Sequence, residues 1–273
     1  MLKNQTVTEA EIRKTIVEIA AHCGEAAHIG GSLSMVELTN ILFRSFLRHR
    51  PSDPHWDGRD IFILSKGHCV LGYLAVLHHY GYFDREKLET FQQNGSDLIA
   101  HPVMKIDLVI ESSNGSLGQG LGYGLGIAIG MQKRGQGRRV VVMMGDGECN
   151  EGSVWEAAAL AGELKVTNLV AVVDENGFRN DGANTMYAKG PSIAEVWRGF
   201  GWQVQEVDGH DVTAIEAAYE AAFDAATGPC VLVAKTIKGK GLSFMEANND
   251  WHHNRITPKV LEQCMEELEA ADG

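Results

Sequence analysis

The second half of the chain alternates between short, almost continuous apolar runs and segments with helical periodicity. Such runs are typical of strands buried on both faces, and helical connections favour parallel pairing of successive strands. The sequence therefore predicts an α/β fold in which a mostly parallel sheet carries helices on both faces. The expected strands and helices follow one another in the order 140–144, 153–165, 169–174, 192–200, 203–207, 213–226 and 230–235.

Helix starts in the first half are marked by capping residues. Thr8 and Glu11 have the spacing of a capping box, and Ser34 and Glu37 have it too, so a helix is expected after each pair. Ser65 can cap the helix that is expected directly after it.

One more apolar run in the first half, 61–64, predicts a buried strand. Residues 81–114 carry no regular pattern, and a Glu-rich helix is expected at 259–271. No repeat, low-complexity tract or linker interrupts the chain. We therefore expect residues 1–273 to form a single domain.

The charge of the chain excludes several classes of partner. It has 24 Lys and Arg residues against 36 Asp and Glu residues, a net charge of −12. Such a surface repels phosphate backbones and anionic lipids, so we expect neither nucleic acid nor a membrane as partner.

The longest uncharged stretch, 112–132, is too polar and glycine-rich to span a bilayer. Residues 1–5 show no apolar signal core, and the five cysteines include no C-x-x-C pair, so a cytoplasmic protein is expected.

Two of the predicted strands end in residues that can hold a metal ion. Asp146 follows the run at 140–144, and Asn176 follows the run at 169–174. A right-handed crossover would make these strands neighbours, which puts the two side chains about 5 Å apart at the carboxyl edge of the sheet. Their oxygens suit Mg²⁺ or Ca²⁺. The alternative is that Asp146 only caps the next helix and that Asn176 only forms a turn.

Glycine is concentrated around these residues. The chain has 31 glycines, and they cluster between 115 and 152. This density marks backbone that something approaches closely. Gly145 and Gly147 leave room for a diphosphate, and the helix N-terminus at 152–154 favours its charge. Close helix packing is the role expected for four other glycines, Gly122, Gly124, Gly126 and Gly130.

Seven stretches of the chain, taken in order, resemble the N-terminal, diphosphate-binding domain of transketolases. The likeness extends from about residue 18 to residue 253 and implies thiamine diphosphate as the cofactor. The matching stretches are 27–31, 59–68, 101–102, 115–120, the Gly-Asp-Gly at 145–147 with its Asn176, 207–211 and 235–241.

The resemblance implies roles at the cofactor site. Asp146, Asn176 and the backbone carbonyl of Phe178 would hold Mg²⁺, for which Ca²⁺ or Mn²⁺ can substitute. Gly147 and Asn176 would lie against the diphosphate. The residues that would line the remainder of the cofactor are His68, Gly115, Ser116 and Leu117.

Four histidines match those that surround the reactive carbon of the cofactor in transketolases: His28, His68, His101 and His252. Splitting a ketose between C2 and C3 needs a base for the C3 hydroxyl and donors for the C2 oxygen, and near-neutral imidazoles can do both. His253 is the alternative to His252. Glu151 matches an acid that links cofactor-activating carboxylates near the subunit interface, although a helix dipole would equally favour an acid there.

The resemblance covers only the first part of a transketolase. In this family a second, Pyr-type domain on another subunit supplies the carboxylate and the apolar wedge that thiamine diphosphate needs. We therefore expect an N-terminal subunit that is active only with a separate C-terminal subunit, which carries the Pyr and C-terminal domains, in an α2β2 assembly. Together they would transfer a two-carbon ketol unit from a ketose or ketose phosphate to an aldose, as a transketolase-type transferase.

Other functions stay open at the level of sequence. The chain could be the α chain of a 2-oxoacid dehydrogenase, a ligase similar to 1-deoxyxylulose-5-phosphate synthase, or a non-catalytic cofactor-binding scaffold. Lys66, Ser116 and Phe178 stand where asparagine, proline and isoleucine are common in full-length transketolases. In this they resemble the shorter, split transketolase-like chains.

Overall fold

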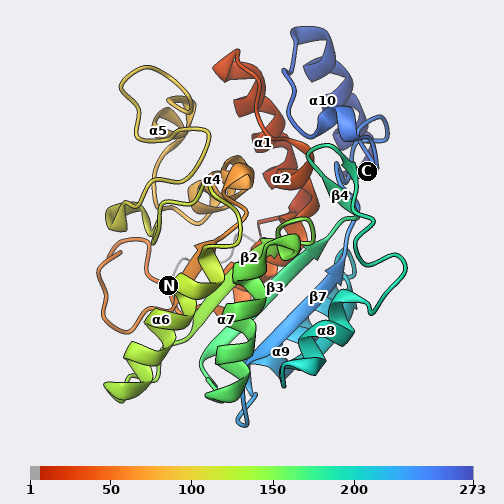
Figure 1. Ribbon diagram of the computed structural model, residues 1–273. Helices are drawn as coiled ribbons and strands as arrows, with labels where there is room; N and C mark the ends of the chain where they lie inside the picture. The colour runs from red at the N-terminus through yellow and green to blue at the C-terminus, as the bar shows by residue number, and fades with distance from the viewer. Residues whose placement is uncertain (1–6, 273) are drawn as a thin grey trace.

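The computed structural model describes residues 7–272, so residues 1–5, which show no apolar signal core, lie outside the described part. At its centre is a five-stranded sheet in the order β1-β2-β3-β7-β6 (Figure 1). All four pairings are parallel. The strands are β1 (Ile61–Leu64), β2 (Val140–Gly145), β3 (Leu169–Glu175), β6 (Gln203–Asp208) and β7 (Cys230–Lys235).

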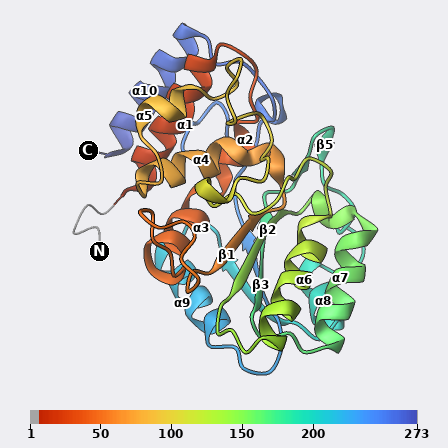
Figure 2. The same ribbon diagram turned by 90° about the vertical axis from the view of Figure 1, so that its left-hand side faces the viewer.

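Helices cover both faces of the sheet, which confirms the predicted fold class. Figure 2 shows α3 and α9 on one face and α6, α7 and α8 on the other. Alternate strand residues divide between the two sides: Met143 joins the core beneath α3 and α9, whereas Val142 joins the opposite core. The bounds of these helices are α3 (Val36–Ile41), α6 (Gly120–Lys133), α7 (Gly152–Glu163), α8 (Ile193–Gly199) and α9 (Val212–Phe223).

A second group of helices gathers beyond the end to which the strands point (Figures 1 and 2). There α1 contacts both α4 and α10, and α2 contacts α4. Between this group and the sheet runs a two-stranded antiparallel hairpin of β4 (Phe178–Arg179) and β5 (Gly182–Ala183). The helices are α1 (Glu9–Cys23), α2 (Gly30–Ser34), α4 (Val70–His79), α5 (Arg85–Glu89) and α10 (Pro258–Asp272).

One of the three predicted caps is confirmed and two are wrong. Thr8 and Glu11 form the expected capping box at the start of α1. Ser34 instead ends α2 and donates a hydrogen bond to the Asp174 carboxylate at 2.6 Å. Ser65 accepts from the Gly120 N–H at 3.0 Å and donates to Glu148. Both hydroxyls serve long-range contacts at the end of the sheet, so neither is available to cap a helix.

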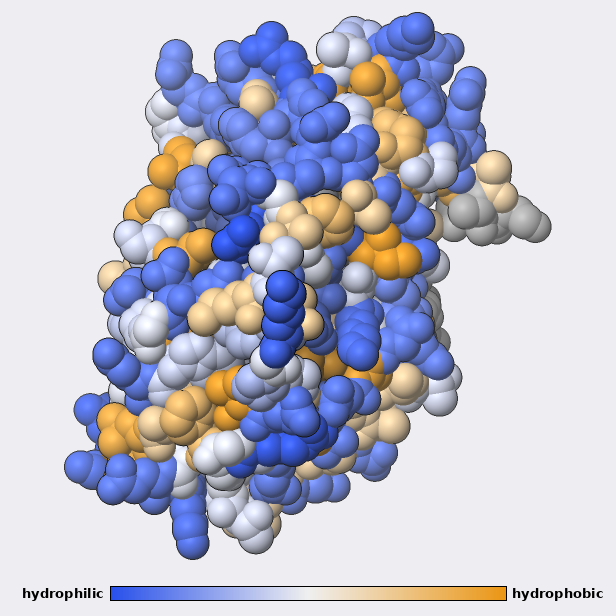
Figure 3. All heavy atoms as spheres, turned by 45° about the vertical axis from the view of Figure 1, so that its right-hand side comes forward, coloured by the Kyte–Doolittle hydropathy of each residue, from blue (hydrophilic) through white to orange (hydrophobic). Residues whose placement is uncertain are grey.

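The surface carries polar side chains with scattered apolar patches. Figure 3 shows one such face, on which hydrophilic residues predominate. Within residues 7–272, no helix combines the length and the apolar character needed to cross a membrane.

Candidate cofactor and metal site

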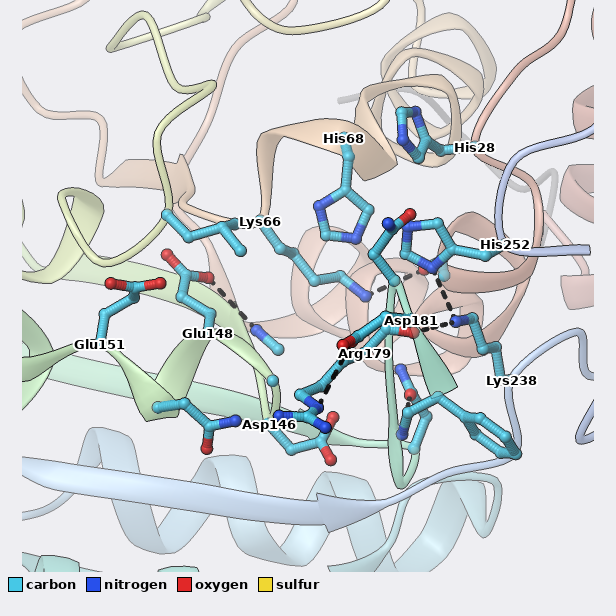
Figure 4. A pocket seen from close by; sticks show the side chains of 18 of the residues that line it. His28, Lys66, His68, Asp146, Glu148, Glu151, Arg179, Asp181, Lys238 and His252 are labelled. Atoms are coloured by element: carbon cyan, nitrogen blue, oxygen red, sulfur yellow. Dashed lines mark hydrogen bonds and ion pairs between the residues drawn. The ribbon is translucent and has the colours of Figure 1, made fainter. Parts of the chain in front are cut away.

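A cavity of about 420 Å³ opens at the carboxyl ends of β2 and β3. These two strands are neighbours, as predicted, with Gly145 opposite Asp174 in the register. The cavity is therefore bounded by the residues that directly follow the strands and by the helices and hairpin that face them (Figure 4). Its lining includes the predicted residues His28, His68, Gly115, Leu117, Asp146, Gly147, Glu151, Asn176, Phe178 and His252.

Asp146 presents a buried carboxylate oxygen that has no partner. The residue is only 2% exposed, and its Oδ2 atom accepts a hydrogen bond from Asn184 Nδ2 at 3.0 Å. Its Oδ1 atom is buried and makes no hydrogen bond. Burial raises the pKa of Asp146 to about 6. Because an unpaired buried carboxylate oxygen is costly, this arrangement fits a cation that would complete its coordination.

Asn176 and the backbone carbonyl of Phe178 lie on the same wall of the cavity. The Asn176 side chain is held by two hydrogen bonds, one from Phe178 N to its Oδ1 at 3.1 Å and one from its Nδ2 to Asp174 Oδ2 at 3.2 Å. The Phe178 carbonyl oxygen would lie 3.4 Å from a Cβ atom at Gly147. One carboxylate, one amide and one carbonyl are a hard-oxygen set that suits Mg²⁺ when water and phosphate complete it.

A metal ion bound here would be held by one carboxylate together with an amide and a backbone carbonyl, rather than by a cluster of His, Cys, Asp or Glu side chains. Within residues 7–272, no group of three or more His, Cys, Asp or Glu side chains is arranged to hold a metal. This is compatible with the mixed donor set above, because only one of its three members is a carboxylate.

The glycine-rich loop forms another part of the wall. Gly115 and Leu117 line the cavity, whereas Ser116 is exposed and is not part of the lining. The structure thus brings two of the three residues predicted for this segment to the cavity.

Glu148, which sequence reasoning missed, ties this loop to the sheet. It is 2% exposed, and it accepts hydrogen bonds from Gly118 N at 2.8 Å, from Gly145 N at 3.3 Å and from the Ser65 hydroxyl. Burial raises the pKa of Glu148, and these donors oppose that rise. Its position inside the Gly-Asp-Gly-Glu motif was the signal available in the sequence.

Lys66, which lines the cavity, forms a buried ion pair with Asp174, and sequence reasoning missed this pair as well. Burial disfavours both charges, but each stabilises the other, so the pKa of Lys66 is raised and that of Asp174 is lowered. Ser34, Thr236 and the Asn176 amide also donate to Asp174. The pair thereby fixes one side of the Asn176 side chain.

The predicted histidines gather on the opposite side of the cavity. The His28 ring centroid lies 5.3 Å from His68, 5.3 Å from His252 and 5.6 Å from His101. His253 also contacts His28, at 4.4 Å, but His252 lines the cavity and His253 and His101 do not. The chain therefore brings the four histidines together, with His28 at their centre.

Three of these imidazoles, those of His28, His68 and His252, have a lowered pKa and are therefore uncharged at neutral pH. Burial, followed by His253, His252, His101 and Lys238, lowers the pKa of His28 to about 3. Burial and Lys238 lower the pKa of His252 to about 4, and burial and Lys66 hold the pKa of His68 well below its usual value. Neutral rings can accept or donate a hydrogen bond to a hydroxyl.

Lys238 is a further residue of the site that was not singled out from the sequence. Its Nζ atom donates to Asn249 Oδ1 at 2.7 Å and to the Arg179 carbonyl at 3.3 Å, and it lies 2.7 Å from His252 Nδ1. Burial lowers the pKa of Lys238 to about 8. The cavity thus joins the oxygens that could hold a cation, with Lys238 and Arg179 beside them, to a cluster of imidazoles (Figure 4).

Known proteins resemble the chain along nearly its whole described length. Residues 8–268 match the family described as "Transketolase, thiamine diphosphate binding domain". The 6-deoxy-6-sulfo-D-fructose transketolase subunit SqwG of Clostridium sp. (strain MSTE9) is 36% identical, with 94% of each chain covered. An apulose-4-phosphate transketolase chain of Phocaeicola vulgatus, also named as a subunit, is 35% identical, and the match covers 94% of this chain and 90% of the relative.

Solved structures of longer proteins show the same fold. Transketolase from Campylobacter jejuni superposes with a TM-score of 0.88 at 27% identity, and transketolase from Pichia stipitis does so with 0.88 at 28%. The match covers 96% of this chain in both cases, but only 42% and 40% of the two longer chains. The chain therefore has the length of the separate subunits and spans less than half of the solved transketolases.

Proposed function

The chain belongs to the transketolase family, as its thiamine diphosphate-binding domain, and on that premise we propose that it is the N-terminal subunit of a two-chain transketolase. With a separate subunit it would transfer a two-carbon ketol unit from a ketose or ketose phosphate to an aldose acceptor. The observation that carries this proposal is the unpartnered Asp146 Oδ1 atom, which lies in a cavity wall shared with Asn176 and the Phe178 carbonyl.

At the cofactor end, Asp146, Asn176 and the Phe178 carbonyl would hold Mg²⁺, or Ca²⁺ or Mn²⁺ in its place. Gly147 and Asn176 would lie against the diphosphate, and Gly115, Ser116 and Leu117 against the aminopyrimidine. Bound thiamine diphosphate supplies the electron sink that lets a carbon–carbon bond beside a ketose carbonyl break.

At the substrate end, the histidines would handle hydroxyls. His28, His68, His101 and His252 are close enough to act on one donor molecule, and those with a lowered pKa are neutral, so their ring nitrogens can accept or donate hydrogen bonds to its hydroxyls. We assign the role to His252 rather than His253 because His252 lines the cavity. Glu151 would connect the site to the carboxylates of the partner subunit.

The remaining parts of the proposal concern assembly and compartment. We propose that residues 1–273 act as one unit, and that two copies combine with two copies of a chain that carries the Pyr and C-terminal domains. The relatives of matching length are named as subunits, which supports a separate partner. The five cysteines are all buried and unpaired, which suits the reducing cytoplasm.

The test is a ketol-transfer assay with the chain alone, with its partner alone, and with both. We expect Mg²⁺- and thiamine diphosphate-dependent transfer from a ketose to an aldehyde only when both chains are present. Transfer at ordinary rates by this chain alone would contradict the two-chain proposal. Release of CO₂ from pyruvate by the mixture would instead indicate a 2-oxoacid dehydrogenase component, and binding without turnover would indicate a scaffold.

A further inference from the structure

The hairpin of β4 and β5 places an arginine in the wall of the cavity. Arg179 is the second residue of β4 and lies, in the view of Figure 4, between Asp146 and Lys238. Its Cγ atom would lie 3.1 Å from a Cβ atom at Gly147. The stem of Arg179 therefore runs along the same glycine that is proposed to lie against the diphosphate.

The guanidinium group of Arg179 is only loosely engaged by the protein. Its Nε atom is buried and has no hydrogen-bond partner. Its ion-pair partner is Asp181 on the same hairpin, at 3.6 Å from Nε, and that carboxylate is 74% exposed. A buried N–H of a charged group without an acceptor is costly. An anionic ligand in the cavity could supply the missing acceptor to Arg179.

The backbone that carries Arg179 is fixed in place. The Arg179 carbonyl accepts a hydrogen bond from Lys238 Nζ at 3.3 Å, and the Asn180 carbonyl accepts one from Asn249 Nδ2 at 2.9 Å. At the base of the hairpin, Asn184 N donates to the Gly177 carbonyl at 2.8 Å. Because these hydrogen bonds hold the hairpin backbone in place, less conformational entropy is lost when the Arg179 side chain binds a ligand.

The other two cations of the cavity are already committed. Lys66 is paired with Asp174, and Lys238 is shared between Asn249, the Arg179 carbonyl and His252. The lining also holds the carboxylates of Asp146, Glu148, Glu151 and Asp181. A diphosphate carries more negative charge than one divalent ion offsets, and a guanidinium fork matches phosphate oxygens in geometry.

We propose that Arg179 is a diphosphate-binding residue of this chain, which donates through its guanidinium group to phosphate oxygens of the cofactor. The inference rests on the proposed function, because it takes thiamine diphosphate as the ligand. It adds a recognition residue on the β4–β5 hairpin to the metal and glycine contacts.

The test is calorimetry on the full chain with two probes, thiamine diphosphate and inorganic diphosphate, each in the presence of Mg²⁺. Arg179→Gln removes the charge, Arg179→Lys keeps the charge but loses the fork, and Arg134→Gln makes the same charge change at an exposed position at the end of α6. We expect Arg179→Gln to bind both probes about tenfold more weakly, Arg179→Lys to lose about threefold, and Arg134→Gln to match the wild type. Raising the salt concentration should weaken binding less steeply in Arg179→Gln than in the wild type.

The outcomes separate this inference from the proposed function. If the wild type binds both probes and Arg179→Gln binds them within twofold of it, the role of Arg179 is wrong while the proposed function stands. If the wild type binds neither probe even with the partner subunit present, both fail together. Circular dichroism and thermal unfolding check that the variants fold. If Arg179→Gln does not fold, Arg179→Lys takes its place. Weaker binding of both probes by Arg179→Lys, with unchanged binding by Arg134→Gln, then supports the inference, and unchanged binding by Arg179→Lys contradicts it.

Discussion

At the scale of single residues, the site depends on burial as much as on the identity of its side chains. Burial disfavours a proton on the His28 ring, and the other imidazoles and Lys238 around the ring disfavour it further. The ring therefore stays neutral at pH values far below the usual pKa of histidine. The cluster is thereby prepared for hydrogen bonding to hydroxyls, at some expense of stability in acid.

This expense gives a pH prediction. The ordinary pKa of histidine is near 6.5, whereas that of folded His28 is about 3. Below pH 6.5 the unfolded chain binds a proton that the folded chain does not, so His28 destabilises the fold increasingly as the pH falls from 6.5 towards 3. Between pH 7 and pH 5, we expect the free energy of unfolding of the wild type to fall by about 1 kcal/mol more than that of His28→Asn, measured by urea unfolding. Equal losses in the two proteins, with His22→Asn as the exposed control, would contradict this.

Residues of the site differ in how far the sequence reveals them. Asp146 and Asn176 could be found because each directly follows a strand, and adjoining parallel strands bring their ends together. Lys66 and Glu148 could not, since their partners are set by packing: Lys66 pairs with Asp174, 108 positions away, and Glu148 accepts from Gly118, 30 positions away. Ser34 was misjudged for the same reason, because a local capping pattern yields to a buried carboxylate.

At the scale of elements, the apolar runs located every strand of the main sheet to within a residue. The strand order was not predictable, since nothing in a local pattern tells that β7 inserts between β3 and β6. The role of the helix glycines was predicted in only one of four cases. A Cβ atom at Gly124 would meet Val142, but at Gly122, Gly126 and Gly130 it would meet nothing within 4 Å.

The glycines of α6 therefore give a pair of opposite expectations. In Gly124→Ala the new Cβ would lie 2.5 Å from Val142 Cγ2, and overpacking should outweigh the gain in helix propensity by about 1–2 kcal/mol. Gly126→Ala meets open space and should stabilise the chain by about 0.5–1 kcal/mol. Chemical denaturation of the isolated chain measures both. If both substitutions changed the stability in the same direction, the assignment of Gly124 to the packed side of α6 and of Gly126 to its exposed side would be wrong.

At the scale of the whole molecule, we propose that the chain supplies one half of a catalytic centre. The sheet edge, the hairpin and the helices beyond it form a cavity lined by Asp146, Asn176 and Phe178, which are proposed to hold a cation, and by the imidazoles of His28, His68 and His252. The solved relatives are more than twice as long, and this chain corresponds to 42% of the transketolase from Campylobacter jejuni. In our account the remaining contacts to cofactor and sugar come from a separate subunit, so the substrate is chosen in large part there.

The central claim is that Asp146 anchors the cofactor through a divalent ion, and titration calorimetry of thiamine diphosphate with and without Mg²⁺ tests it most directly. The proteins to compare are the wild type, Asp146→Ala and, as a control for loss of an exposed carboxylate, Asp224→Ala. We expect Mg²⁺-dependent binding in the wild type and in Asp224→Ala, and binding at least about tenfold weaker and independent of Mg²⁺ in Asp146→Ala. Unchanged affinity and unchanged Mg²⁺ dependence in Asp146→Ala would contradict the account.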